Sequence, residues 1–375
     1  MTRPIADDHI TGIQPYVPGK QVEEIKREYG VTDIIKLASN ENPLGPSPEA
    51  QRIVREHAGN MHIYPDGDAH ELKHAIAEYH GVPVDQVLHG NGSDQLLRLA
   101  VQALARWGQD HGVVSEHSFG AYPIALQGHN LDFDVAKMAE GLRYDLDAMR
   151  ELVRPNTRIV FIANPNNPTG TYVDRDSLRE FLRYLPEDVV PIVDEAYVQY
   201  AVADDYASAL EMRDAHENLI VTRTFSKCYG MAGLRIGYMI ARPEIVDGMN
   251  RVRAPFNCNR IGQKAARAAL ADTDFVEESV ELNENGREQL EEGFRKLEGK
   301  GVDWTPSETN FLLVETPYHG PDLYEEMLYE GVIVRPMVGY GLPNHLRITI
   351  GTEEQNERCL NALSKALDKM AERQG

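Results

Sequence analysis

A lysine with several phosphate-binding side chains close to it in the chain is the feature most able to do chemistry. Lys227 ends the run Thr224-Phe225-Ser226-Lys227, and Arg235 follows eight positions later. A lysine amine can form a Schiff base with an aldehyde, while hydroxyls and a guanidinium can donate hydrogen bonds to a phosphate. An aldehyde cofactor that carries a phosphate needs both, so the combination suggests pyridoxal phosphate. A Ser-Lys pair on its own is usually a solvated surface turn.

A second candidate element is a carboxylate at the end of an apolar run. Asp194 follows Val189-Val190-Pro191-Ile192-Val193, which predicts a buried strand, and Tyr197 comes three residues later. Ligand groups in α/β sheets lie at the carboxyl ends of parallel strands, and a carboxylate there could keep a pyridine nitrogen protonated. Tyr197 could then reach the phenolic oxygen of the ring. The alternative is that Asp194 caps a helix and Tyr197 only packs.

Two loops complete the set of candidate elements. The loop Asn164-Pro165-Asn166-Asn167-Pro168-Thr169-Gly170 contains two prolines and a glycine, which predict a rigid connection that could hold the Asn167 amide against a ligand oxygen. The turn Gly90-Asn91-Gly92-Ser93-Asp94 precedes a helical pattern. A helix that starts after a glycine turn can bind an anion through its backbone N–H groups and its dipole. Taken alone, each of these loops could be an ordinary turn.

Taken together in the order in which they occur along the chain, the four elements resemble the fold-type I aminotransferases that use pyridoxal phosphate, over roughly residues 10–370. The resemblance implies three catalytic residues: Lys227 forms the Schiff base, Asp194 pairs with the pyridine nitrogen, and Tyr197, with Asn167, contacts the phenolic oxygen. Phe119 stands where the family stacks an aromatic ring on the cofactor. The remaining cofactor-binding residues implied around the phosphate are Gly92, Ser93, Asp94, Thr224, Ser226 and Arg235, with Asp94 orienting its neighbours.

Further segments resemble the histidinol-phosphate aminotransferases within that family. They are residues 13–20, residues 39–46 with 64–67, and residues 334–337 with 341–351. The resemblance implies transamination between histidinol phosphate and 2-oxoglutarate, which gives imidazole acetol phosphate and glutamate in histidine biosynthesis.

Two arginines are the centre of the substrate site that this resemblance implies. The family clamps a carboxylate with the arginine that matches Arg347, whereas histidinol phosphate offers a phosphate, which two guanidinium groups bind well. Arg335 supplies the second group. The implied substrate-binding residues are Tyr16, Asn40, Asn310, Arg335 and Arg347. Alternatively, the arginines could form ordinary salt bridges, and Tyr16 could only anchor the N-terminal arm.

Tyr64 resembles the family tyrosine that reaches across a dimer interface to the cofactor phosphate of the neighbouring subunit. We therefore expect a homodimer in which Tyr64 completes the partner's site. Rival functions stay open at this point. They are an aminotransferase for aromatic amino acids or arogenate, a decarboxylase of a phosphorylated amino acid, and a cofactor-binding protein without turnover.

Composition restricts the partners and the compartment. A net charge of −21 argues against a nucleic-acid partner, because the phosphate backbone would be repelled. No apolar run approaches the roughly 20 residues of a membrane span, and the first residues lack a signal-peptide pattern, so we expect no membrane partner and no export. The three cysteines are widely spaced, which suits a reducing cytoplasm. No histidine spacing predicts a metal site.

The elements that must position these residues alternate between β-rich and helical patterns. Apolar runs near 85–89, 112–115, 158–163, 188–193, 218–224 and 234–241 predict an α/β fold with a mostly parallel sheet between helices. The resemblance adds that this is the seven-stranded type of sheet found in aspartate-aminotransferase-like proteins of fold type I. We expect an N-terminal arm at 1–30, a large cofactor-binding domain at 31–255 and a smaller α/β C-terminal domain at 256–375. In the last, a helix near 275–298, strands near 310–315, 332–335 and 345–350 and a final helix at 353–371 are expected.

Overall fold

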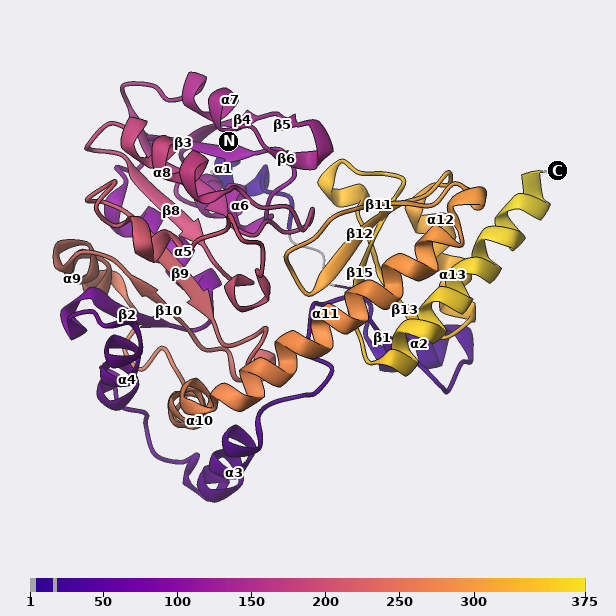
Figure 1. Ribbon diagram of the computed structural model, residues 1–375. Helices are drawn as coiled ribbons and strands as arrows, with labels where there is room; N and C mark the ends of the chain where they lie inside the picture. Colours follow the sequence, from indigo (N-terminus) through magenta and orange to yellow (C-terminus); the bar gives the residue numbers. More distant parts are fainter. Residues whose placement is uncertain (1–4, 16–18, 375) are drawn as a thin grey trace.

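The structure is a computed structural model that describes residues 5–15 and 19–374. Its main feature is a seven-stranded sheet in the order β2-β10-β9-β8-β7-β3-β4 (Figure 1). The strands are β2 (Val87–Gly90), β10 (Gly237–Ile240), β9 (Ile220–Thr224), β8 (Val190–Asp194), β7 (Thr157–Ala163), β3 (His111–Ser115) and β4 (Asp132–Ala136). Neighbouring strands are parallel except around β10, which is antiparallel to β2 and β9. The predicted mostly parallel α/β sheet is confirmed.

The central strands are continuous apolar runs because both faces of the sheet are buried. Alternate residues of β7 show this: Ile159 and Phe161 belong to the core on one face, whereas Val160 and Ile162 belong to the core on the other. The helices that supply the first core are α5 (Ser93–Leu104), α6 (Ala121–Gly128) and α9 (Pro243–Val252), and those that supply the second are α7 (Leu146–Glu151) and α8 (Arg175–Tyr184). Helices therefore cover both faces, as the sequence predicted.

The edge strand β4 was not predicted from the sequence. Its residues Asp132 and Asp134 interrupt the apolar pattern, and Val135 is 47% exposed. Acidic side chains on an edge strand discourage pairing with another chain. The same charges remove the apolar signal by which a strand is detected.

A second, four-stranded antiparallel sheet lies in the C-terminal part of the chain, in the order β11-β12-β15-β14. Its strands are β11 (Asp303–Thr305), β12 (Phe311–Glu315), β15 (His345–Thr349) and β14 (Arg335–Pro336). The short β11 was not predicted. Three helices pack on this sheet: α11 (Thr273–Arg295), α12 (Gly320–Tyr329) and α13 (Glu353–Gln374).

The long helix α11 connects the two sheets (Figure 1). Near its start, Val276 and Val280 pack beside Tyr197, while Leu290 and Phe294 near its end belong to the core of the small sheet. One continuous helix therefore contacts both the loop after β8 and the second sheet.

Two contacts indicate which segments belong with the large sheet and which with the small sheet. Strand β1 (Ile35–Lys36) pairs in parallel with β13 (Val332–Ile333), so it lies beside the C-terminal part. Helix α10 (Arg260–Ala271) packs against α3 (Pro48–His57) and α4 (His70–His80), both from the first part of the chain. The chain thus crosses between the parts near residue 37 and again along α11.

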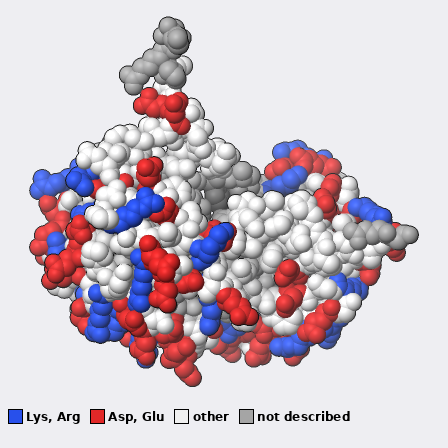
Figure 2. Space-filling view, turned by 90° about the horizontal axis from the view of Figure 1, so that it is seen from above, with Lys and Arg blue, Asp and Glu red and all other residues white. Residues whose placement is uncertain are grey.

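Acidic side chains are spread over the face seen in Figure 2, with basic ones between them, rather than gathered in one patch. Along the part of the chain that the structure describes, no helix combines the length and the apolar character needed to cross a membrane.

A buried ion pair joins β8 to β9 on the face of the sheet away from α5 and α6. Arg223 donates to Glu195 Oε2 through Nε at 3.0 Å and Nη2 at 2.8 Å. The Ser208 hydroxyl and the Ala209 backbone N–H also donate to the same carboxylate. Removing one partner of such a pair leaves an uncompensated charge in the interior.

We predict that Arg223→Met lowers the free energy of unfolding by about 3–5 kcal/mol, since Glu195 would stay buried without its cation. Urea denaturation followed by circular dichroism measures this loss. The control is Arg251→Met, which breaks an ion pair whose arginine side chain is 74% exposed and should change stability by less than about 0.5 kcal/mol. Equal losses in the two variants would contradict the prediction.

Candidate active site

The carboxyl ends of four parallel strands surround one cavity of about 140 Å³. Strands β3, β7, β8 and β9 lead into the loops that supply most of its walls, as expected for a ligand site in an α/β sheet. The lining residues are Ser93, Asp94, Phe119, Tyr122, Ala163, Pro165, Asn167, Asp194, Ala196, Tyr197, Thr224, Ser226, Lys227 and Arg235. The structure thus brings together the four sequence elements that were singled out.

Asp194 is the buried charge of this cavity, with 5% of its surface exposed. Thr222 donates to its Oδ1 at 3.0 Å, and Tyr122 donates to its Oδ2 at 3.0 Å. Burial raises the pKa of Asp194 from its ordinary value of 3.8 to about 6, although both hydrogen bonds oppose the shift. A cation placed against this carboxylate would favour its ionised form.

Lys227 also lines the cavity and is partly buried. Its Nζ donates to the backbone oxygen of Ser39 at 3.2 Å and lies 5.6 Å from the ring centroid of Tyr197. The lysine amine is therefore held inside the cavity by the segment that precedes Asn40. This position suits an amine that must bond to a ligand in the cavity.

The end of the cavity beside α5 gathers groups that could hold an anion. No side chain caps the start of α5, where Ser93 is the first residue, so its N–H groups can serve a ligand. Thr224 donates to Ser226 Oγ at 3.0 Å, and Arg235 Nη1 donates to the same oxygen at 3.2 Å. Asp94 accepts from Arg98 Nε at 3.2 Å.

Two glycines allow this close approach. A Cβ at Gly92, whose φ is +75°, would lie 2.6 Å from Arg235 Nη2, and a Cβ at Gly237 would lie 2.5 Å from the Ser93 backbone nitrogen. At distances this short, a side chain at either position would force Arg235 or the start of α5 to move.

Hydrogen bonds of asparagine side chains link cavity residues to the C-terminal part of the chain. Asn40 Nδ2 donates to the Tyr197 hydroxyl at 2.9 Å, and Asn310 Nδ2 donates to the Asn40 backbone oxygen at 3.1 Å. Arg347 Nη1 donates to Asn167 Oδ1 at 2.6 Å. This bond orients the Asn167 amide so that its NH2 group is the donor left for a ligand.

Tyr197 stays a hydrogen-bond donor in this environment. Burial raises the pKa of its hydroxyl, and the nearby positive charge of Arg347 opposes the shift. Because Asn40 donates to the hydroxyl oxygen, the hydroxyl proton can be given to another acceptor.

Arg335 and Arg347 are direct partners on β14 and β15. Arg347 is 6% exposed and lies over the Phe311 ring, whereas Arg335 is partly exposed. Neither arginine belongs to the cavity lining itself, but Arg347 touches it through Asn167.

Tyr64, a predicted cofactor-binding residue, does not line this cavity. The Tyr64 side chain is 75% exposed, and its ring packs against Phe256 with centroids 4.8 Å apart. Tyr16 lies outside the described residues.

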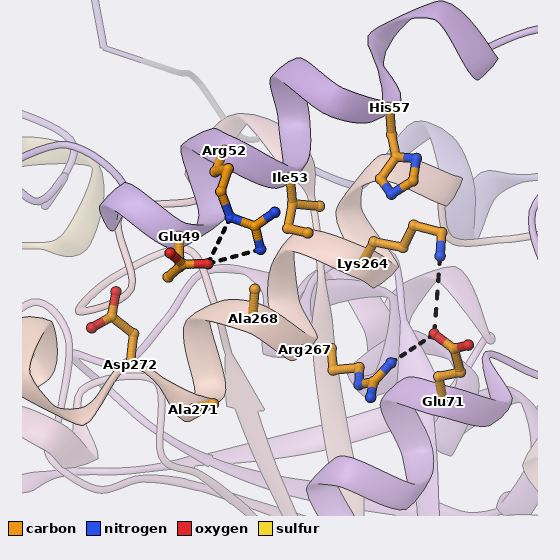
Figure 3. Close-up of a pocket in the computed structure, with 10 residues that line it drawn as sticks. All are labelled: Glu49, Arg52, Ile53, His57, Glu71, Lys264, Arg267, Ala268, Ala271 and Asp272. Atoms are coloured by element: carbon orange, nitrogen blue, oxygen red, sulfur yellow. Dashed lines mark hydrogen bonds and ion pairs between the residues drawn. The ribbon is translucent and has the colours of Figure 1, made fainter.

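A larger cavity of about 480 Å³ lies between α3 and α10 (Figure 3). Its charges compensate one another: Arg52 pairs with Glu49 at 2.9 Å, and Arg267 pairs with Glu71 at 2.9 Å. Lys264 reaches Glu71 at 4.0 Å. This cavity therefore lacks the combination of nucleophile and buried acid found at the strand ends. Across the described residues, no group of three His, Cys, Asp or Glu side chains is arranged to hold a metal ion.

The comparisons with known proteins agree on one family. The sequence model described as "Aminotransferase class I and II" matches residues 32–363. This chain belongs to that family. The histidinol-phosphate aminotransferase 2 of Methylococcus capsulatus is 48% identical over 363 residues, covering 96% of this chain and 97% of that protein. The histidinol-phosphate aminotransferase of Anaeromyxobacter sp. is 46% identical over 365 residues, with 97% and 99% covered.

A solved structure gives the same answer for the fold of this aminotransferase. The histidinol-phosphate aminotransferase from Sinorhizobium meliloti, in complex with pyridoxal-5'-phosphate, matches with a TM-score of 0.88 at 28% identity. The match covers 98% of this chain and 99% of that chain. The resemblance to fold-type I aminotransferases is confirmed.

Three contacts of the aminotransferase site were not predicted from the sequence. Tyr122 and Thr222 hold Asp194, and Gly237 makes room for the start of α5. A signal for Thr222 existed, because it alternates with Thr224 on a strand and therefore shares its face. Tyr122 lies in the first turn of α6, three residues after Phe119, which precedes that helix, and the two rings meet edge-on.

We predict a pH-dependent destabilisation of the cofactor-free protein through Asp194. Because its folded-state pKa is raised to about 6, the folded protein keeps this proton between about pH 4 and 6 while the unfolded chain releases it. The stability that the protonated Asp194 carboxyl contributes is fully present below its ordinary pKa of 3.8 and is lost as the pH rises through about 6. Relative to Asp194→Asn, the wild type should lose on the order of 3 kcal/mol across this range.

Urea unfolding of both cofactor-free proteins from pH 4.5 to 7.5 measures the difference. Parallel stability profiles would show that the Asp194 carboxyl has an ordinary pKa in the folded protein. Addition of pyridoxal phosphate should reduce the destabilisation in the wild type, because a cationic ring favours the ionised carboxylate.

Proposed function

We propose that this aminotransferase transfers an amino group between histidinol phosphate and 2-oxoglutarate, giving imidazole acetol phosphate and glutamate in histidine biosynthesis. Relatives that are 46–48% identical over nearly the whole chain carry the name histidinol-phosphate aminotransferase. The observation that carries the proposal is the cross-strand pair of Arg335 and Arg347. Like charges opposite one another destabilise a sheet, and a phosphate dianion between the two guanidinium groups would remove that repulsion.

The cavity residues fit pyridoxal phosphate as the cofactor. Lys227 would bond to its aldehyde carbon, Asp194 would face the ring nitrogen, and Phe119 would stack on the ring. The start of α5 with Ser226 and Arg235 would hold its phosphate, in agreement with the uncapped helix and the glycines that let these groups meet. When bound, the protonated ring withdraws the electrons that the substrate α-carbon releases.

The residues of the chain then divide the work between proton transfer and orientation. Lys227 Nζ, once released from the cofactor by the substrate amine, would carry the proton between the substrate α-carbon and the cofactor. Tyr197 and Asn167 would donate to the phenolic oxygen, and Asn40 and Arg347 hold these two donors in place.

The arginines would alternate between two anions. In one half-reaction they bind the phosphate of histidinol phosphate, and in the other they bind a carboxylate of glutamate or 2-oxoglutarate. Asn310 also belongs to the proposed substrate site. Its Oδ1 is buried and accepts no hydrogen bond from the described residues, which suits an acceptor that waits for a ligand group.

The test of this function is a single-turnover titration of the cofactor-loaded protein, followed by the absorbance change that accompanies amination of the cofactor. Histidinol phosphate should give rapid conversion, while phenylalanine and phosphothreonine should give little. Comparable conversion by phenylalanine would assign an enzyme for aromatic substrates. Release of carbon dioxide from phosphothreonine would assign a decarboxylase.

Lys227→Ala is the matched variant for that titration. It should bind the cofactor without a covalent link, detected as no mass gain after borohydride reduction, and lose about 10²-fold to 10⁴-fold in turnover. Lys365→Ala, at a side chain that is 63% exposed on α13, should behave as the wild type. Near-normal turnover of Lys227→Ala would contradict the role proposed for Lys227 in cofactor bonding and proton transfer.

We also propose a homodimer in which Tyr64 reaches the cofactor phosphate of the partner subunit. Its support is an exposed apolar cluster on one side of the chain: Met61 is 74% exposed, Ile63 44%, Tyr64 75% and Phe256 47%. Clusters of this kind mark protein interfaces. In a symmetric dimer the same cluster meets its copy, so each site would depend on both chains.

Subunit mixing tests the shared site. Tyr64→Ala and Lys227→Ala should each be impaired as homodimers, because the first weakens the partner's phosphate contact and the second lacks the amine. Refolded mixtures should recover activity, since a heterodimer holds one site with both residues intact. Lack of recovery in mixtures that do form heterodimers would show that Tyr64 does not act in the partner's site.

We further propose that residues 1–30 form an arm and that the large and small domains divide along α11 rather than at residue 256. The contacts of α10 with α3 and α4 support this later boundary, and the pairing of Ile35 and Lys36 of β1 with β13 supports a place for that strand in the small domain. A cytoplasmic location is proposed on the three buried, free cysteines, which suit a reducing compartment.

A further inference from the structure

Tyr122 is fixed by packing before any ligand is considered. The residue is fully buried, its ring stacks on Phe161 with centroids 4.6 Å apart and planes 5° apart, and Phe119 meets it edge-on at 5.7 Å. Rings held on two sides cannot swing away. In this fixed position the Tyr122 hydroxyl donates to Asp194 Oδ2 at 3.0 Å.

The Asp194 carboxylate receives one internal donor on each oxygen, Tyr122 on Oδ2 and Thr222 on Oδ1. An ionised carboxylate can accept about four hydrogen bonds, so both oxygens keep room for another donor. Both internal bonds favour the ionised form, whereas burial opposes it. The other titratable groups that interact electrostatically with Asp194 are Asp94, Tyr144, Glu195 and Tyr197.

We propose that Tyr122 is a positioning residue that keeps Asp194 ionised, so that the proton shared between Asp194 and the cofactor ring stays on the ring nitrogen. The proposal rests on the proposed pyridoxal-phosphate function. Without the Tyr122 hydroxyl, the ring N–H bond breaks and an O–H bond forms on Asp194. The number of protons is unchanged, but the ring becomes neutral and withdraws electrons less well.

The substitution that isolates this role is Tyr122→Phe, which removes one oxygen and keeps the ring that stacks on Phe161. The protein is loaded with pyridoxal phosphate labelled with nitrogen-15 in the ring, and the chemical shift of that nitrogen is followed against pH. The midpoint for ring deprotonation should fall by about one to two pH units, the size expected for one hydrogen bond to a charged group. The kcat should fall, while KM for each substrate stays unchanged because Tyr122 acts through Asp194.

Tyr238→Phe is the matched control. It also removes a buried tyrosine hydroxyl, one that is 2.8 Å from His80 Nε2 and makes no hydrogen bond with Asp194. This variant should keep the wild-type nitrogen shift and kcat. An equal change in the two variants would mean that loss of any buried hydroxyl has this effect, and it would overturn the proposal.

A double-mutant cycle with Asp194→Asn separates positioning from packing. In the Asp194→Asn background, Tyr122→Phe should cause no further change in ring protonation or kcat. Additive effects would overturn the proposal. If Tyr122→Phe does not fold alone but folds together with Asp194→Asn, the hydroxyl acts through the Asp194 charge, as proposed. Failure of both to fold would assign Tyr122 a packing role and overturn it.

The proposed function and this inference fail in different ways. A wild-type protein that does not bond to pyridoxal phosphate through Lys227 overturns both. A wild-type protein that bonds and turns over normally, with a Tyr122→Phe variant whose ring nitrogen and kcat are unchanged, overturns only the role of Tyr122.

Discussion

The site is organised around the burial of one carboxylate. Asp194 ends a strand whose surroundings are apolar, and an ionised group there is unfavourable unless donors and a cation are supplied. Thr222 comes from the next strand and Tyr122 from a helix on the same face, so the two donors depend on the register of β8 with β9 and on the packing of α6. A cationic ring in the cavity would complete the compensation. A bound ligand with a cationic ring would therefore complete the compensation of a buried charge that the fold alone compensates only in part.

A contact on the other face of β8 and β9 helps to fix the register of these two strands. Asp194 pairs with Thr222 across β8 and β9, whereas the next residue on each strand, Glu195 and Arg223, forms the buried ion pair on the other side. A shift of one residue would exchange the two faces, bringing Arg223 into the cavity and leaving Glu195 without its cation. Buried ion pairs add little stability over apolar packing. Here the ion pair makes the shifted register of β8 and β9 unfavourable. The observed register, in which Thr222 lies opposite Asp194 and donates to it, is thereby favoured.

The order of motifs could be predicted from the sequence because each follows a continuous apolar strand or opens a helix, and parallel strands end at one edge. Lys227, Asp194 and Asn167 consequently lie around one cavity. The contacts of Tyr122 and Gly237 could not be predicted, since they depend on distances between elements far apart in the chain. The edge strand β4 was missed because acidic residues replace its apolar pattern. The place of α10 was also not apparent, because an amphipathic helix carries no signal of which sheet it covers.

Arg347 is held by contacts from several segments of the fold. Arg347 donates to Asn167 and to the Ala38 backbone oxygen and lies over Phe311, so three separate segments fix its guanidinium. Arg335 lies on the short strand β14 and is partly exposed. A guanidinium group held in one orientation can bind an anion only in a matching geometry. In a chain with a net charge of −21, the two neighbouring arginines would offer local positive charge to an anionic substrate.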